Sequence, residues 1–164
     1  MGDDVIFSPL AMPNLTLKNR VLRSSISGRI DNYDGTGTRA RINWERRFAR
    51  GGVGALISAH VPIHVRGRIL PNYAFIDRDE RIPFWRAVGD AVHAHDCKFI
   101  LQLSHAGRQQ DIAGIENLKR HAQSATAHTE QFHGFHPDRM SREQIRDTVA
   151  QFAAGARRAR AAGL

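Results

Sequence analysis

Three short apolar runs along the chain are each followed by residues at helical spacing, and this alternation limits the fold more than any other feature. The runs lie at Val21-Leu22, at 53–59 and at 98–103. Strands separated by helices imply a parallel sheet with right-handed crossovers. A closed barrel of this kind needs eight strands and about 250 residues. The 164 residues therefore predict either a small open α/β sheet or about the first three βα units of a (β/α)8 barrel. The end of the chain one residue after a helix favours the second.

The three helices have recognisable ends. The first is expected over Thr38–Arg50, before Gly51-Gly52, which would stop it. The second begins near Pro83 and continues to His95. The third begins after Ser141, which forms a capping-box pattern with Gln144, and ends near Gly163. The predicted apolar positions are Ile42, Trp44, Phe48 and Ala49 in the first helix, Phe84, Val88, Ala91 and Val92 in the second, and Ile145, Val149, Phe152, Ala153, Ala156 and Ala159 in the third.

The net charge of +8, from 24 basic and 16 acidic residues, favours anionic partners. The basic residues are scattered, however, so we expect solvated helix faces rather than a nucleic-acid surface. The largest such group is Arg39, Arg41, Arg46, Arg47 and Arg50 with Glu45. A small basic module that binds a polyanion remains an alternative. The single Cys97 and the lack of a membrane-length apolar run predict a cytoplasmic protein without membrane contact.

Polar residues follow each predicted strand. They are Ser24–Ser27 after the first strand, His60 after the second, and Gln102 and Ser104 in and after the third. Ligands of parallel α/β folds bind at the carboxyl ends of the strands, so these residues form a candidate site. The alternative is that strand ends turn polar because they meet water. Gln102 interrupts an apolar run, and its amide would suit a ring with alternating carbonyl and N–H groups. An outward-facing or core-bonded glutamine would explain it equally well.

The remaining histidine, cysteine and acidic residues are weaker candidates for a functional site. Four histidines crowd the long connection 104–140, but their spacing fits no zinc pattern, so we expect no metal site: His121, His128, His133 and His136. We expect the ring of His105 to bond the backbone. Cys97 should be a buried small hydrophobe, and Asp77, Asp79 and Glu80 a charged turn. The connections 60–80 and 104–140 should be functional or hold small elements of their own.

Four segments together resemble one family. They are Phe7–Leu10 with Lys18–Leu22, Phe48–Ser58, Phe99–Gln109, and Arg139–Ile145 with Ala156–Gly163. In order and spacing they resemble the Old Yellow Enzyme family, the FMN-dependent NADH:flavin oxidoreductases and ene-reductases on a TIM barrel. The resemblance implies that residues 1–164 are the N-terminal part of an FMN-binding TIM-barrel domain, with 104–140 as a capping region.

The resemblance also implies roles for residues of the candidate site. The residues expected at the flavin are Ser24, Ser25, Ile26, Ser27, His60 and Gln102. Ser27 takes the place of a family Thr or Cys, and His60 that of a small residue. Ser104, which replaces a common Trp, and Arg29 are expected at the substrate. The segment Ser24–Ser27 departs from the usual Ala-Pro-Met followed by Thr or Cys.

The implied reaction passes hydride from NADH or NADPH through FMN to an activated alkene such as an enone, a small-molecule substrate. The family's proton donor comes from a segment after residue 164, so no catalytic residue is named. The alternative is a catalytically incomplete fragment without independent activity. The choice between NADH and NADPH, the electron acceptor and association into a homo-oligomer stay open.

Overall fold

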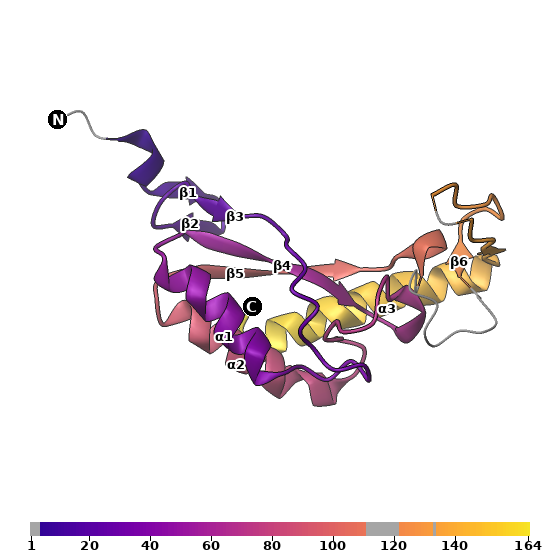
Figure 1. Ribbon diagram of the computed structural model, residues 1–164. Coiled ribbons are helices and arrows are strands. Elements are labelled where there is room, and N and C mark those ends of the chain that lie inside the picture. Colours follow the sequence, from indigo (N-terminus) through magenta and orange to yellow (C-terminus); the bar gives the residue numbers. More distant parts are fainter. Residues whose placement is uncertain (1–3, 111–121, 133) are drawn as a thin grey trace.

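A three-stranded parallel sheet with three helices forms the centre of the protein (Figure 1). The computed structural model describes residues 4–110, 122–132 and 134–164. The sheet has the order β3 (Leu22–Arg23), β4 (Ala55–Pro62), β5 (Lys98–Ser104). The helices α1 (Arg39–Arg50), α2 (Ile82–His93) and α3 (Arg142–Ala161) alternate with these strands. The predicted succession of parallel strands and crossover helices is confirmed.

A small antiparallel hairpin precedes the sheet. It pairs β1 (Leu10–Met12) with β2 (Leu15–Leu17). Pro13-Asn14 makes the turn between the two strands, and Leu17 is fully buried. Short elements also occur in the two long connections, as expected: the 3-10 helices η2 (Val65–Gly67), η3 (Asp79–Arg81) and η4 (Gly107–Gln109), and the parallel pair β6 (Gln123–Ser124) and β7 (Asp138–Arg139). A further 3-10 helix, η1 (Val5–Phe7), precedes β1.

Helix ends follow the predicted signals. The Thr38 side chain accepts a hydrogen bond from Arg41 N at the start of α1. Both halves of the capping box of Ser141 and Gln144 are present at the start of α3. Gly163 follows α3 in the left-handed region, at φ +86°. The second helix is shorter than predicted, since α2 ends at His93 and leaves His95 outside it.

The core lies between the sheet and the helices. Leu56 of β4 and Phe99 of β5 pack with Trp85, Val88 and Val92 of α2. Cys97 is fully buried beside them, as predicted. Figure 1 shows the three helices together along one side of the sheet. The strand positions that face this side are therefore the ones that the core buries.

The predicted apolar face of α3 is wrong at four of its six positions: Ile145, Val149, Ala153 and Ala156 are exposed, and of the six only Phe152 and Ala159 pack, partly buried, against the core. Ile145 and Val149 are 44% and 64% exposed, whereas Gly155 is buried. A methyl group on Gly155 would meet Ile63 at 3.1 Å, so the helix touches the core closely at this point. Burial is therefore decided by where α3 crosses the core. The first turns of α3 extend beyond the core, so their apolar residues stay exposed.

The expectation that Arg41 and Glu45 belong to a solvated helix face was wrong. Both side chains are buried, with exposed fractions of 2% and 0%. They lie on the face of α1 that is turned toward β3 and form ion pairs there. Among the described residues, no helix is both long enough and apolar enough to cross a membrane.

Candidate functional site

A β-bulge in β4 sets the geometry of the strand ends. Ile57 pairs with Ile100, but His60 pairs with Gln102, so β4 advances by three residues between these two pairs while β5 advances by two. Regular alternation would turn His60 away from the face that Ile57 occupies. The extra residue restores it to that face. The bulge therefore places His60 beside Gln102 on the side of the sheet opposite the helices.

Ser58 stabilises this bulge. Its Oγ accepts a hydrogen bond of 2.9 Å from Gln102 N, a strand donor that the register shift would otherwise leave unpaired. Ser58 is buried, and its hydroxyl donates to Ala59 O at 2.8 Å. The side chains of Gln102 and His60 then approach to 3.5 Å between Nε2 and Nδ1. Their contact is long, so the Gln102 amide keeps capacity for a further partner.

Tyr73 joins the first strand end to the second. Its hydroxyl donates a 2.6 Å hydrogen bond to Ser27 Oγ. Its ring meets the His60 ring edge to face, with centroids 6.1 Å apart. Three predicted site residues, Ser27, His60 and Gln102, are thus linked through a tyrosine that the sequence analysis did not consider.

The end of β5 carries an unpaired polar atom. Ser104 Oγ is buried and has no hydrogen-bond partner among the described residues. A pocket of about 430 Å³ opens here, and His60, Gln102 and Ser104 all line it. A buried hydroxyl without a partner is costly, so a polar ligand in this pocket would be stabilised. The donor and acceptor set suits a heterocycle edge, which is the part of FMN that Gln102 was predicted to meet.

The other predicted residues lie around the first strand end. Ser24, Ile26 and Ser27 are exposed and Ser25 is half-buried, in the irregular segment after β3. Arg29 is exposed and has a left-handed backbone, at φ +46°. Ser27 alone of these is tied to the group around Gln102 by a hydrogen bond.

A buried network of ion pairs joins the central sheet to α1. Arg23 of β3 pairs with Glu45 of α1, which also pairs with Arg41. Arg41 in turn pairs with Asp31 at 2.7 Å. The Arg23 guanidinium also lies 4.4 Å from the centroid of the Phe48 ring. The two arginines balance the two carboxylates, so this network of four side chains is neutral. It connects β3, α1 and the β3–α1 connection.

Two histidines beside the site have fixed ring orientations. His105 Nδ1 accepts from Gly107 N at 3.1 Å, which confirms that its ring bonds the backbone. His64 Nδ1 accepts from Arg66 N at 3.1 Å. Burial lowers the pKa of His105, and the neighbouring His64 acts in the same direction. Burial and Arg66 lower the pKa of His64.

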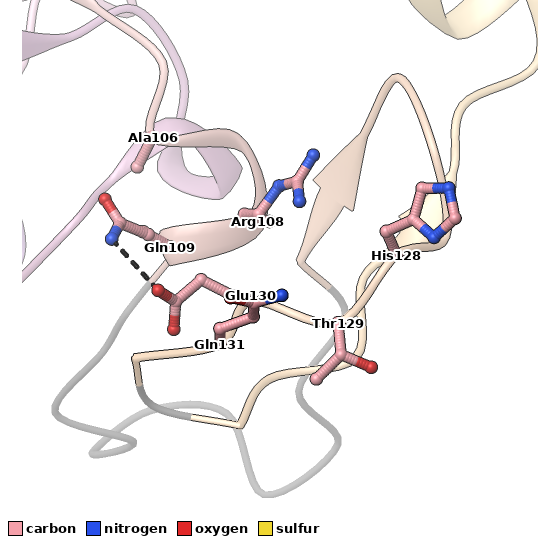
Figure 2. Close-up of a pocket in the computed structure, with 7 residues that line it drawn as sticks. All are labelled: Ala106, Arg108, Gln109, His128, Thr129, Glu130 and Gln131. Atoms are coloured by element: carbon pink, nitrogen blue, oxygen red, sulfur yellow. Dashed lines mark hydrogen bonds between the residues drawn. The ribbon is translucent and has the colours of Figure 1, made fainter.

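A larger pocket, of about 840 Å³, lies in the connection between β5 and α3 (Figure 2). Figure 2 shows Gln109 pointing to Glu130, with a contact of 3.4 Å between Nε2 and Oε1. None of the three strand-end residues His60, Gln102 and Ser104 lines this pocket. We place the candidate site in the smaller pocket, because the polar groups of the strand ends converge there.

The structure supplies no metal site among the residues it describes. No group of three or more His, Cys, Asp or Glu in residues 4–110, 122–132 and 134–164 could hold an ion. Of the four histidines in the long connection, His128 and His136 are exposed, and His136 contacts Thr129 at 2.8 Å. His121 and His133 lie outside the described residues. The acidic residues at 77–80 form a charged turn as predicted, in which Asp77 pairs with Arg78 and Arg81.

Comparison with known sequences assigns a family. Residues 5–164 match the model of the NADH:flavin oxidoreductase / NADH oxidase family. The chain is 33% identical over 163 residues to an NADH:fumarate oxidoreductase of Klebsiella pneumoniae, covering 99% of this chain and 17% of that protein. It is 31% identical over 159 residues to an NADPH dehydrogenase of Listeria welshimeri, covering 96% and 45%. The chain therefore spans less than half the length of these relatives.

Solved structures show the same fold. Morphinone reductase in complex with tetrahydroNAD aligns with a TM-score of 0.84 at 23% identity, over 97% of this chain and 47% of that one. Old Yellow Enzyme from Pichia sp. AKU4542 aligns with a TM-score of 0.84 at 20% identity, over 96% and 43%. These structures are TIM barrels. The predicted fold, about the first three βα units of such a barrel, is confirmed.

Proposed function

Because the chain belongs to the NADH:flavin oxidoreductase / NADH oxidase family, we propose that it binds FMN at the carboxyl ends of β3, β4 and β5 and serves NAD(P)H-dependent reduction. The observation that carries the proposal is the convergence of His60, Gln102 and the unpaired Ser104 hydroxyl on one pocket. FMN would supply hydride transfer from NADH or NADPH to an acceptor.

The residues of the chain would hold and orient the ring. The Gln102 amide offers two N–H donors and a carbonyl acceptor, which match alternating carbonyl and N–H groups. Ser27 presents a hydroxyl from the end of β3, and Tyr73 holds it. Ser24, Ser25, Ile26 and His60 would form the remaining wall. Ser104 and Arg29 would lie toward the substrate.

The proposed substrate class is an activated alkene, such as an enone or an unsaturated acid. The relative from Klebsiella pneumoniae is named for fumarate, an alkene conjugated to two carboxylates. Hydride addition to such an alkene needs an electron-withdrawing group on the neighbouring carbon. Arg29 is exposed and lies two residues after Ser27 in the sequence. Its positive charge would suit a carboxylate on the substrate.

The polyanion-binding alternative has less support. Three arginines that would have to meet a polyanion are buried instead: Arg23, Arg41 and Arg68. Arg23 and Arg41 are neutralised by the carboxylates beside them. The number of basic side chains available to meet a polyanion is therefore smaller than the sequence count of 24 suggests.

Titration of the purified chain with FMN, followed by the visible flavin spectrum, tests the proposal. We expect a perturbed bound spectrum and about tenfold weaker binding in Gln102→Ala, the loss expected for a desolvated hydrogen-bonded group. Gln131→Ala, in the larger pocket, is the matched control and should bind FMN normally. If Gln131→Ala weakened binding and Gln102→Ala did not, the site would be misplaced. A chain that bound no FMN would be the catalytically incomplete form.

A further inference from the structure

The hydrogen bond between Tyr73 and Ser27 joins a fully enclosed side chain to one at the surface. Tyr73 is 3% exposed, whereas Ser27 is exposed at the strand end. The two residues are 46 positions apart in the sequence, and their oxygens are 2.6 Å apart. A buried phenol needs a partner, but satisfying it does not require an exposed residue of the candidate site.

The chemistry of the two hydroxyls fixes the direction of this bond. A phenol is a stronger acid than an alcohol, so it is the better donor, and the alcohol oxygen is the better acceptor. Tyr73 therefore donates and Ser27 Oγ accepts. A serine hydroxyl has one proton and two lone pairs, so Ser27 keeps its own O–H for another acceptor. With one lone pair occupied, that O–H has a restricted range of directions.

The backbone around Tyr73 is held to the same connection that carries Ser27. Asn72 Nδ2 donates to Asp31 O at 3.0 Å, and Ala74 N donates to Asp31 Oδ2 at 3.2 Å. Asn72 has a left-handed backbone at φ +68°, which turns the chain between these two contacts. Arg41 holds the Asp31 carboxylate from α1 with two further hydrogen bonds. Tyr73 thus has a fixed position relative to Ser27.

We propose that Tyr73 is a positioning residue of the flavin site, which holds the Ser27 hydroxyl as a hydrogen-bond donor toward the bound ring. This inference rests on the proposed FMN site. A donor aimed at the ring stabilises the reduced form, which carries more negative charge than the oxidised form. Tyr73 therefore raises the reduction potential of the flavin without touching it.

The potential of bound FMN tests this role in four proteins: the unchanged chain, Tyr73→Phe, Ser27→Ala and the double variant. We expect Tyr73→Phe to weaken binding of reduced relative to oxidised FMN by up to tenfold, which lowers a two-electron potential by about 30 mV. In the Ser27→Ala background the same change should have no further effect. Tyr33→Phe, which removes the chain's other tyrosine hydroxyl, is the matched control and should leave the potential unchanged.

Two results would overturn the proposal. One is an unchanged potential in Tyr73→Phe. The other is an equal shift with and without Ser27, because Tyr73 would then act by another route. Thermal unfolding of each variant identifies any change that comes from a loosened fold, since a merely structural role would lower the melting temperature without this dependence on Ser27.

A second measurement needs no flavin. The chain has two tyrosines, so Tyr33→Phe leaves Tyr73 as the only phenol. The intensity ratio of its Raman doublet reports whether the hydroxyl donates. We expect Ser27→Ala to change this ratio, and an unchanged ratio would refute the contact. If the chain bound no FMN, the proposed function would fail, whereas this ratio would still decide whether Tyr73 holds Ser27.

Discussion

Arg41 donates two hydrogen bonds, of 3.0 and 2.7 Å, to one carboxylate oxygen of Asp31, and both side chains are buried. The same oxygen accepts from Ala74 N at 3.2 Å. A single carboxylate thus connects α1 to the connections that follow β3 and β4. Glu45 continues this network to Arg23 in the sheet. The candidate site lies on a frame of buried charges rather than on apolar packing alone.

Replacement of Glu45 should show how much this frame contributes. Glu45→Gln leaves Arg23 and Arg41 buried with one carboxylate fewer, and removing one partner of a buried pair costs about 3–5 kcal/mol. We expect the free energy of unfolding, measured in urea, to fall by about that amount. Glu143→Gln, an exposed change in the first turn of α3, should cost no more than about 1 kcal/mol. Equal effects at the two positions would contradict a buried network.

Stability should also fall in acid because of His64 and His105. Burial lowers the pKa of both histidines in the folded state. The unfolded chain, with an ordinary histidine pKa of about 6.5, therefore binds protons first as the pH falls. The stability that depends on the neutral rings is present above pH 6.5 and is lost as the pH falls toward the folded-state pKa values.

Urea unfolding on both sides of pH 6.5 measures this loss. The double change His64→Asn with His105→Asn keeps an oxygen acceptor near the Arg66 and Gly107 N–H groups but removes the titration. It should flatten the pH dependence. His93→Asn, at the exposed end of α2, should leave it as it is. A double variant as sensitive to acid as the unchanged chain would show that other groups are responsible.

Gly37 lies against the Phe84 ring, so a side chain at this position should destabilise the fold. A Cβ built on Gly37 would lie 1.9 Å from the Phe84 ring, so the ring or the backbone must move. We expect Gly37→Ala to cost about 1–3 kcal/mol, the usual range for overpacking. Phe84→Leu shortens the opposing side chain, so combining it with Gly37→Ala should cost less than the sum of the two changes. Strict additivity would mean that the two residues do not touch.

Cys97 offers a direct probe of global unfolding. It is the chain's single cysteine, it is fully buried, and burial raises the pKa of its thiol. Both effects slow its reaction with a disulfide reagent. With a stability of about 5 kcal/mol or more, we expect the reaction to be about a thousandfold slower in the folded chain than in urea.

An exposed cysteine supplies the comparison for this probe. Ala153→Cys in a Cys97→Ser background places the thiol on the outside of α3 and should react rapidly in both states. If Cys97 reacted equally fast in the folded chain, the thiol would not be enclosed as the structure shows.

Local sequence signals were enough to predict the three α-helices and the three strands of the central sheet in order. Capping residues such as Ser141 and Gln144 act within a few positions of one another, and their hydrogen bonds formed as expected. The apolar run at β5 needs no distant partner to be recognised. The helix ends were predicted less accurately. Helix α2 stops two residues before His95, because helix length depends on where the next strand must begin.

The sequence also pointed to the strand ends as the place of the site, since parallel strands bring their carboxyl ends together. The arrangement within that site could not be predicted. Strict alternation would have turned His60 away, and only the bulge pairs it with Gln102. Nothing near Tyr73 in the sequence indicates that its hydroxyl meets Ser27.

The sequence by itself therefore determined the βα repeat, the helix caps and the polar strand ends, because each depends on residues close together in the chain. The tertiary structure decided that Arg41 and Glu45 are buried, that β4 carries a bulge and that Tyr73 reaches Ser27. These features depend on partners far apart in the chain. A charge can be buried only where an opposite charge meets it, and the positions of both are fixed only when the sheet and helices have packed.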